Sequence, residues 1–114
     1  MITINGVKPD MIANNVEPFE PTHPGSVLKE EIECRKISQK KFAEQTGIPY
    51  TALNEVFHCK RAVTTEYALL IEAALGIEPE FWLKMQADYN LMVAKRNVSF
   101  MEKLKNVRKV AAIL

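Results

Sequence analysis

The fold can be predicted from residues 38–61, which read SQKKFAEQTGIPYTALNEVFHCKR. Ser38 is typical of a helix N-cap, and Gly47 ends the same helix because glycine reaches positive φ without a Cβ clash. Ala43 is small, as required where two helices cross closely at a steep angle. Four apolar residues are spaced to fix the second helix on a core: Phe42, Ile48, Leu53 and Val56. The stretch therefore predicts a helix-turn-helix.

The remaining face of the second predicted helix is free to enter the major groove of a duplex. That face carries Tyr50, Thr51, Asn54 and Glu55. Two ordinary packed helices with no ligand are the alternative, because helix-turn-helix corners also occur in proteins that bind nothing. Basic residues on both sides of the segment favour DNA binding.

Outside this segment the chain predicts further short helices and an all-α fold. Residues 1–21 hold three prolines and no sustained periodicity, and they are expected to form an extended arm. Residues 22–95 form the predicted domain of five helices, in which Thr64 caps the fourth helix and Gly76 ends it. Residues 96–114 form a predicted extra amphipathic helix. Its apolar stripe consists of Phe100, Leu104, Val107, Ala111 and Leu114.

Composition and charge are those of one soluble domain. The 114 residues are 47% apolar and carry a net charge of +1, but the charges alternate along the chain. Residues 35–61 contain six Lys/Arg against two Glu, and residues 95–114 contain six against one. No apolar run approaches the roughly eighteen residues of a membrane span, and no secretion signal is evident. The two cysteines favour reduced thiols and a cytoplasmic protein.

Motifs for metal, cofactor or catalysis are not found. His23, Cys34, His58 and Cys59 lack the spacing of a zinc site, and Cys34 is expected to pack against the domain. No GxSxG motif and no phosphate-binding loop is present, so no enzyme and no cofactor is expected. A group of large side chains in the fifth helix is expected to form core or dimer packing, with a ligand pocket as the alternative. The group consists of Phe81, Trp82, Met85, Tyr89 and Met92.

The pattern SQ…A…GI…L…V…KR resembles the phage-repressor-type (XRE) helix-turn-helix family. Further motifs are similar to those of the HigA antitoxins, or plasmid-maintenance antidote proteins. They are HPG at residues 23–25, LKEE at 28–31, ALG at 74–76 and EFWLKMQADYNL at 80–91. The resemblance covers about residues 22–95. It implies a dimeric repressor that binds double-stranded operator DNA of its own operon and neutralises a RelE-like, mRNA-cleaving toxin.

The resemblance also implies roles for individual residues. Contacts to base edges are expected from Tyr50, Thr51, Asn54 and Glu55, and contacts to phosphates from Gln39, Lys40, His58, Lys60 and Arg61. Asn suits adenine, and the Thr methyl suits a thymine methyl. Glu55 has a second interpretation as a solvent-exposed helix residue, and Lys40 as a residue that serves solubility.

Two positions depart from the family pattern. Pro49 stands where a capping Ser or Thr is usual, but proline is compatible with a helix start. His58-Cys59 stands where Asn-Gly is usual. If position 59 keeps a positive φ, cysteine there costs about 1 kcal/mol relative to glycine. The alternative is a loop of another shape.

A palindromic operator requires two recognition helices about 34 Å apart, so one chain with one such helix implies a twofold homodimer. The apolar stripe of residues 96–114 is expected to be buried, either on its own domain or across the dimer. Two rival functions remain open at this point. One is a stand-alone repressor without a toxin, and the other is a helical interaction module that no longer binds DNA.

Overall fold

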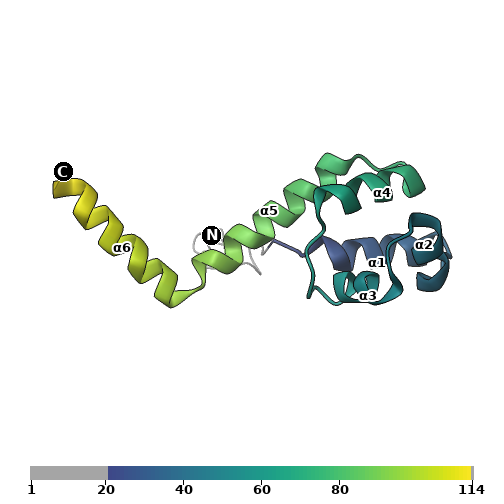
Figure 1. Ribbon diagram of the computed structural model, residues 1–114, viewed down its shortest axis with the longest axis horizontal. Coiled ribbons are helices and arrows are strands. Elements are labelled where there is room, and N and C mark those ends of the chain that lie inside the picture. Colours follow the sequence, from purple (N-terminus) through teal and green to yellow (C-terminus); the bar gives the residue numbers. More distant parts are fainter. Residues whose placement is uncertain (1–20, 114) are drawn as a thin grey trace, which may run out of the picture.

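The computed structural model describes residues 21–113, which form six α-helices and no strand within that range (Figure 1). The helices are α1 (Pro24–Cys34), α2 (Gln39–Thr46), α3 (Tyr50–Phe57), α4 (Thr65–Leu75), α5 (Pro79–Lys95) and α6 (Val98–Ile113). The predicted all-α fold is thus confirmed. The expected arm falls almost wholly on residues outside the described range.

Local capping chemistry sets the helix boundaries. The Ser38 hydroxyl accepts a hydrogen bond from the Lys41 N–H at 3.0 Å and begins α2, as predicted. Thr64 caps α4 in the same way. Gly47 and Gly76 end α2 and α4 at φ 78°, which confirms the left-handed conformation expected of both.

Helices α1 to α5 enclose one apolar core. Leu28, Phe42, Leu53, Ala68 and Trp82 are fully buried, so each of the five helices contributes to it. Burial of a large aromatic ring such as that of Trp82 anchors α5 on the domain. The helix-turn-helix is therefore supported by three further helices rather than standing alone.

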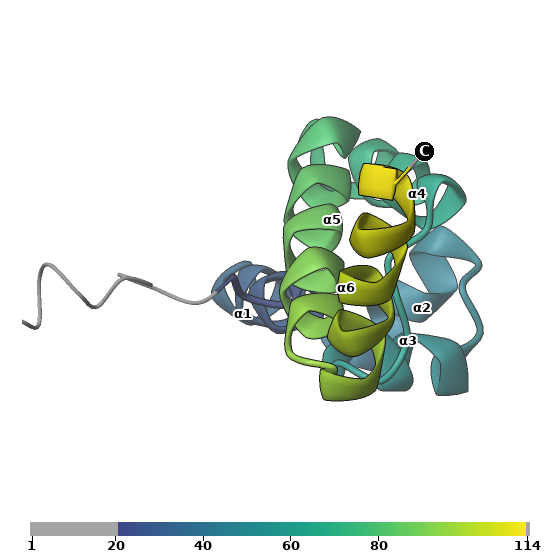
Figure 2. The ribbon, with the colours of Figure 1, turned by 90° about the vertical axis from the view of Figure 1, so that its left-hand side faces the viewer.

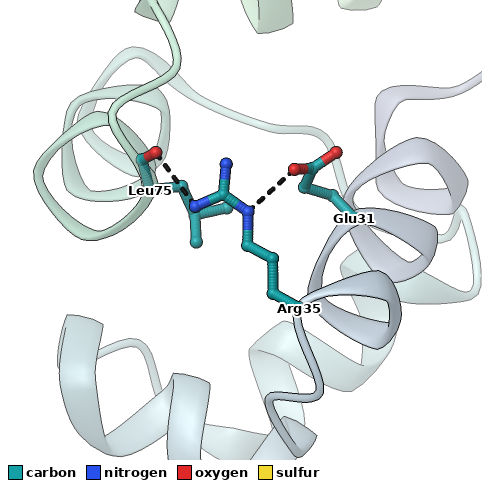
Figure 3. Close-up of polar contacts among 3 residues, drawn as sticks. All are labelled: Glu31, Arg35 and Leu75. Atoms are coloured by element: carbon teal, nitrogen blue, oxygen red, sulfur yellow. Dashed lines mark hydrogen bonds and ion pairs between the residues drawn. The ribbon is translucent and has the colours of Figure 1, made fainter.

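Arg35 ties the end of α1 to the end of α4 (Figure 3). Its Nε donates to the Glu31 carboxylate at 2.8 Å, and its Nη1 donates to the carbonyl of Leu75 at 3.1 Å. Leu75 is the last residue of α4, where carbonyls lack partners within the helix and a cation is favoured. The Arg35 side chain thus donates a hydrogen bond to a carbonyl at the end of α4. It also joins α1 to α4, two helices that are far apart in the sequence.

Helix α6 contacts α5 near the junction of the two helices and otherwise stands away from the domain (Figures 1 and 2). It leaves the end of α5 as a projecting arm, and none of its residues is buried. Leu104 and Met101 are half-buried, whereas Phe100 and Val107 are exposed. Of the two alternatives for the apolar stripe, packing on its own domain is therefore limited to the partial burial of Leu104, and Phe100, Val107 and Ala111 are exposed.

Exposure separates two residues from the core, and the expectation for Cys34 needs correction. Cys34 was expected to pack, but it is exposed because it lies at the end of α1 on the side away from Leu28 and Ile32. Phe81 was grouped with core or dimer residues; it is 47% exposed and so lies outside the core, whereas its neighbour Trp82 is fully buried, and dimer packing of Phe81 stays a prediction. Adjacent helical positions differ by about 100°, so only one of the two faces the core.

Candidate nucleic-acid interface

The turn between α2 and α3 is fixed by backbone and side-chain hydrogen bonds. Beside Gly47, the buried Thr46 hydroxyl donates to the Phe42 carbonyl at 2.9 Å and accepts from the Ile48 N–H at 3.2 Å. These bonds occupy polar groups that the tight turn would otherwise leave unpaired. Sequence reasoning missed Thr46, although Ser and Thr are known to bond nearby backbone in this way.

Helix α3 has two clearly different faces. Ala52, Leu53, Val56 and Phe57 are buried. On the opposite side Tyr50 is 51% exposed, Thr51 and Glu55 are exposed, and Asn54 is half-buried. Because the exposed side chains lie on one face, that face can approach a duplex without moving the core.

The start of α3 follows the expectation for Pro49. This residue takes φ −56° and ψ 141° at the N-cap and provides no side-chain cap. The helix nevertheless begins at Tyr50, because an extended proline leaves the first helical turn intact.

Gly25 brings α1 into direct contact with the backbone of α3. A Cβ at this position would lie 1.7 Å from the Val56 carbonyl oxygen, so only glycine allows this approach. The Gly25 N–H donates a hydrogen bond to Nδ1 of buried His23 at 2.8 Å. Burial lowers the pKa of His23 below its usual 6.5, which favours the neutral ring that accepts this bond. The HPG motif thus fixes the position of the candidate recognition helix.

The segment after α3 keeps the positive φ considered for position 59. Cys59 has φ 62°, and the Cys59 N–H and Lys60 N–H donate to the carbonyls of Val56 and Glu55. This pair of bonds is the Schellman motif, in which glycine is the usual residue at the left-handed position. The loop therefore keeps a glycine-type shape with a cysteine in it, and the alternative of another shape is excluded.

Glu55 and Arg61 form an ion pair in this region. Arg61 Nη2 lies 2.6 Å from Glu55 Oε1, and both side chains are about half-exposed. Glu55, which is expected to contact base edges, thus binds Arg61, which is expected to contact phosphates. The sequence did not reveal this contact. Two residues six positions apart, such as Glu55 and Arg61, come together only because the chain turns back after the helix.

The other expected contact residues come from α2 and from the segment after α3. Lys40 and Tyr50 line one surface hollow of about 520 Å3 between α2 and α3. Exposed His58 uses Nδ1 to bond the Asn54 carbonyl at 2.8 Å, and Lys60 is exposed. Gln39 differs, because its Nε2 is buried and has no hydrogen-bond partner among the described residues.

Within residues 21–113, no three His, Cys, Asp or Glu side chains gather to hold a metal ion, and no helix is long and apolar enough to cross a bilayer. Met85 and Met92 line a groove of about 710 Å3 beside Val27 of α1. Trp82 and Phe81 do not line it, so the large side chains of α5 do not form one common pocket.

Comparison with known proteins agrees with this geometry. Residues 28–82 match the helix-turn-helix family HTH_3. Virulence-associated protein A of Dichelobacter nodosus is 33% identical over 90 residues, which cover 77% of this chain and 86% of that protein. Virulence-associated protein A′ of the same organism is 33% identical over 72 residues, which cover 62% of this chain. The matched region spans only 63% of the length of that second relative.

A solved structure is similar over three quarters of the chain. An addiction module antidote protein of a HigA family from Coxiella burnetii is 32% identical, with a TM-score of 0.65. The match covers 75% of this chain and 95% of that chain. The chain therefore belongs to the HigA family of helix-turn-helix proteins.

Proposed function

We propose that this protein is a sequence-specific, double-stranded DNA-binding antitoxin of a toxin–antitoxin pair. In this proposal it acts in the cytoplasm as a homodimer, represses its own operon and neutralises a RelE-like, mRNA-cleaving toxin. It performs no catalysis and requires no cofactor. The likeness to an addiction module antidote protein supports the antitoxin role.

The observation that carries the DNA-binding role is the division of α3 into two faces. Its apolar residues are buried in the core, whereas Tyr50, Thr51 and Asn54 lie on the outer face. The contact between Gly25 and the backbone of Val56 fixes the position of the helix. A rigid helix with a polar outer face is what direct readout of a major groove requires.

The contact residues then divide by chemistry. Asn54 and Thr51 are proposed to read base edges, together with Tyr50 and Glu55. Phosphate contacts are proposed for Gln39, Lys40, His58, Lys60 and Arg61. Lys60 is the simplest of these to test, because it is exposed and forms no ion pair among residues 21–113, whereas Arg61 is held by Glu55.

The test is a gel shift of the purified protein on the promoter of its own gene at several salt concentrations. Affinity should fall steeply with salt. Lys60→Ala should weaken binding to all sequences and reduce the slope of log affinity against log salt by about one. Asn54→Ala should instead change sequence preference. A flat salt response, or variants with identical profiles, would refute the proposed roles.

The second candidate is a repressor without a toxin, which the helix-turn-helix alone would also support. Co-purification with the product of the neighbouring reading frame separates the two candidates. Recovery of a small ribonuclease in a stable complex supports the antitoxin. Operator binding without any such complex favours the stand-alone repressor.

A further inference from the structure

A groove of about 710 Å3 lies between the start of α1 and the part of α5 that begins at Met85. Its apolar walls include Val27 of α1 and Met85, Leu91 and Met92 of α5. Leu91 is 55% exposed and the other three are half-buried, so these side chains remain partly open to solvent. An exposed apolar surface that is rich in methionine is typical of a site that binds another segment of polypeptide.

The chain enters the described domain at this groove. Pro21 and Thr22 form part of its wall, and residues 1–20 precede them in the sequence. A segment that is joined to the wall of a groove has an effective concentration there on the order of mM. The preceding residues are therefore favoured as the occupant over a separate chain of the same chemistry.

The residues just before Pro21 have a pattern that suits the groove. Residues 16–21 read VEPFEP, and the two prolines favour an extended, polyproline-type conformation with roughly three residues per turn. At that spacing the apolar Val16 and Phe19 share one face, and Glu17 and Glu20 share another. Five such residues reach about 16 Å, and the ten helical steps of α5 from 85 to 95 rise about 15 Å. The segment thus matches the groove in length and presents an apolar face to it.

The charges of the segment and of the groove are complementary. Residues 1–20 carry three acidic side chains against one lysine. At the groove, Lys95 is exposed and forms no ion pair within residues 21–113. The acid of the groove, Asp88, is paired with Lys84 at 3.1 Å. An acidic segment therefore meets an unpaired lysine there, and the carboxylate beside it is already compensated.

We propose that residues 16–20 dock in this groove of their own chain in an extended conformation. In this contact Phe19 inserts between Val27 and Met92, and the acids of the segment face Lys95. The contact requires neither DNA nor a toxin, so it does not rest on the proposed function. A partner protein that binds the same groove would first have to displace the segment.

The test is the rate at which N-ethylmaleimide alkylates single cysteines in the full-length protein. Every variant carries Cys34→Ser and Cys59→Ser, and circular dichroism checks that it folds. Leu91→Cys places the thiol in the groove, and Val93→Cys, at a residue that is 47% exposed and outside the groove, is the matched control. Addition of Phe19→Ser should speed alkylation of Leu91→Cys about tenfold, as expected for a segment docked roughly nine-tenths of the time, and leave Val93→Cys unchanged.

Equal rates with and without Phe19→Ser overturn the proposal, and so does the same acceleration at both cysteines. Dilution separates a contact within one chain from a contact with a second copy. Protection of Leu91→Cys that is independent of protein concentration supports the proposal. Protection that disappears on dilution overturns it, because a second copy then covers the groove.

A charge exchange provides an independent readout in the same assay. Lys95→Glu should speed alkylation of Leu91→Cys severalfold, and addition of Glu17→Lys with Glu20→Lys should restore the slow rate. The direct effect of these charges on the thiol runs the opposite way, because a nearby acid disfavours the reactive thiolate. Acceleration followed by rescue therefore supports the docked segment, and failure of the rescue overturns it.

Discussion

Substitution of Gly25 by alanine provides a direct test of how α1 positions α3. The new Cβ would lie 1.7 Å from the Val56 carbonyl oxygen and 2.7 Å from its carbon, whereas ordinary contact begins at 3.4 Å. The two backbones would have to separate by about 1.7 Å, and no side-chain rotation can relieve the clash. Overpacking of well-packed sites costs roughly 1–3 kcal/mol, so Gly25→Ala should destabilise the fold by about 3 kcal/mol or more.

The matched control is Gly47→Ala. Nothing lies within 4 Å of a Cβ at Gly47, and its φ of 78° is the only penalty, about 1 kcal/mol. Urea and thermal unfolding of both variants provide the comparison. At about 4–8 °C per kcal/mol, Gly25→Ala should lower Tm by roughly 12 °C or more, and Gly47→Ala by much less. Equal losses for the two variants, or a loss below about 1 kcal/mol for Gly25→Ala, would refute the close-contact argument.

Three further results are expected. Cys59→Gly should raise the free energy of unfolding by about 1 kcal/mol in urea titrations, because φ is 62° there; an unchanged or lower value would contradict the strain. Glu55→Gln should release Arg61 for a phosphate and steepen the salt dependence of gel-shift affinity by about 0.9, and an unaltered slope would argue against that release. Since burial lowers the folded-state pKa of His23, its stabilising contribution is complete above pH 6.5 and is lost as pH falls towards that folded value. His23→Asn should flatten this part of the urea-derived stability curve, and an identical curve would exclude His23 as its origin.

Features governed by neighbouring residues were predictable from the sequence. The caps at Ser38 and Thr64 and the helix ends at Gly47 and Gly76 depend on local hydrogen bonds and on φ, and the structure confirms all four. Leu53 and Val56 of α3 were equally clear, because burial at the spacing of a helix leaves a periodic pattern.

Features that depend on distant parts of the chain were not predictable. The bond from Arg35 to Leu75 spans 40 positions, and no local pattern marks it. The Glu55–Arg61 pair required knowledge of the loop path after α3. The stripe of α6 predicted burial, but periodicity cannot say whether the covering surface belongs to the same chain. The DNA contacts and the toxin remain predictions for the same reason, because they concern other molecules.

The close approach of Gly25 to Val56 has a consequence for how the DNA target of the proposed function would change over evolution. The backbone of α1 lies directly against that of α3, and one face of α3 is buried in the core. A tilt of the whole of α3 towards a new DNA sequence would therefore disrupt the core. In the proposed DNA-binding role, a change of target would come from substitutions of the outward side chains Tyr50, Thr51 and Asn54, because none of them belongs to the core. The contact between α1 and α3 would then stay the same while the residues proposed to contact bases vary, so that the protein keeps its fold as its DNA target changes.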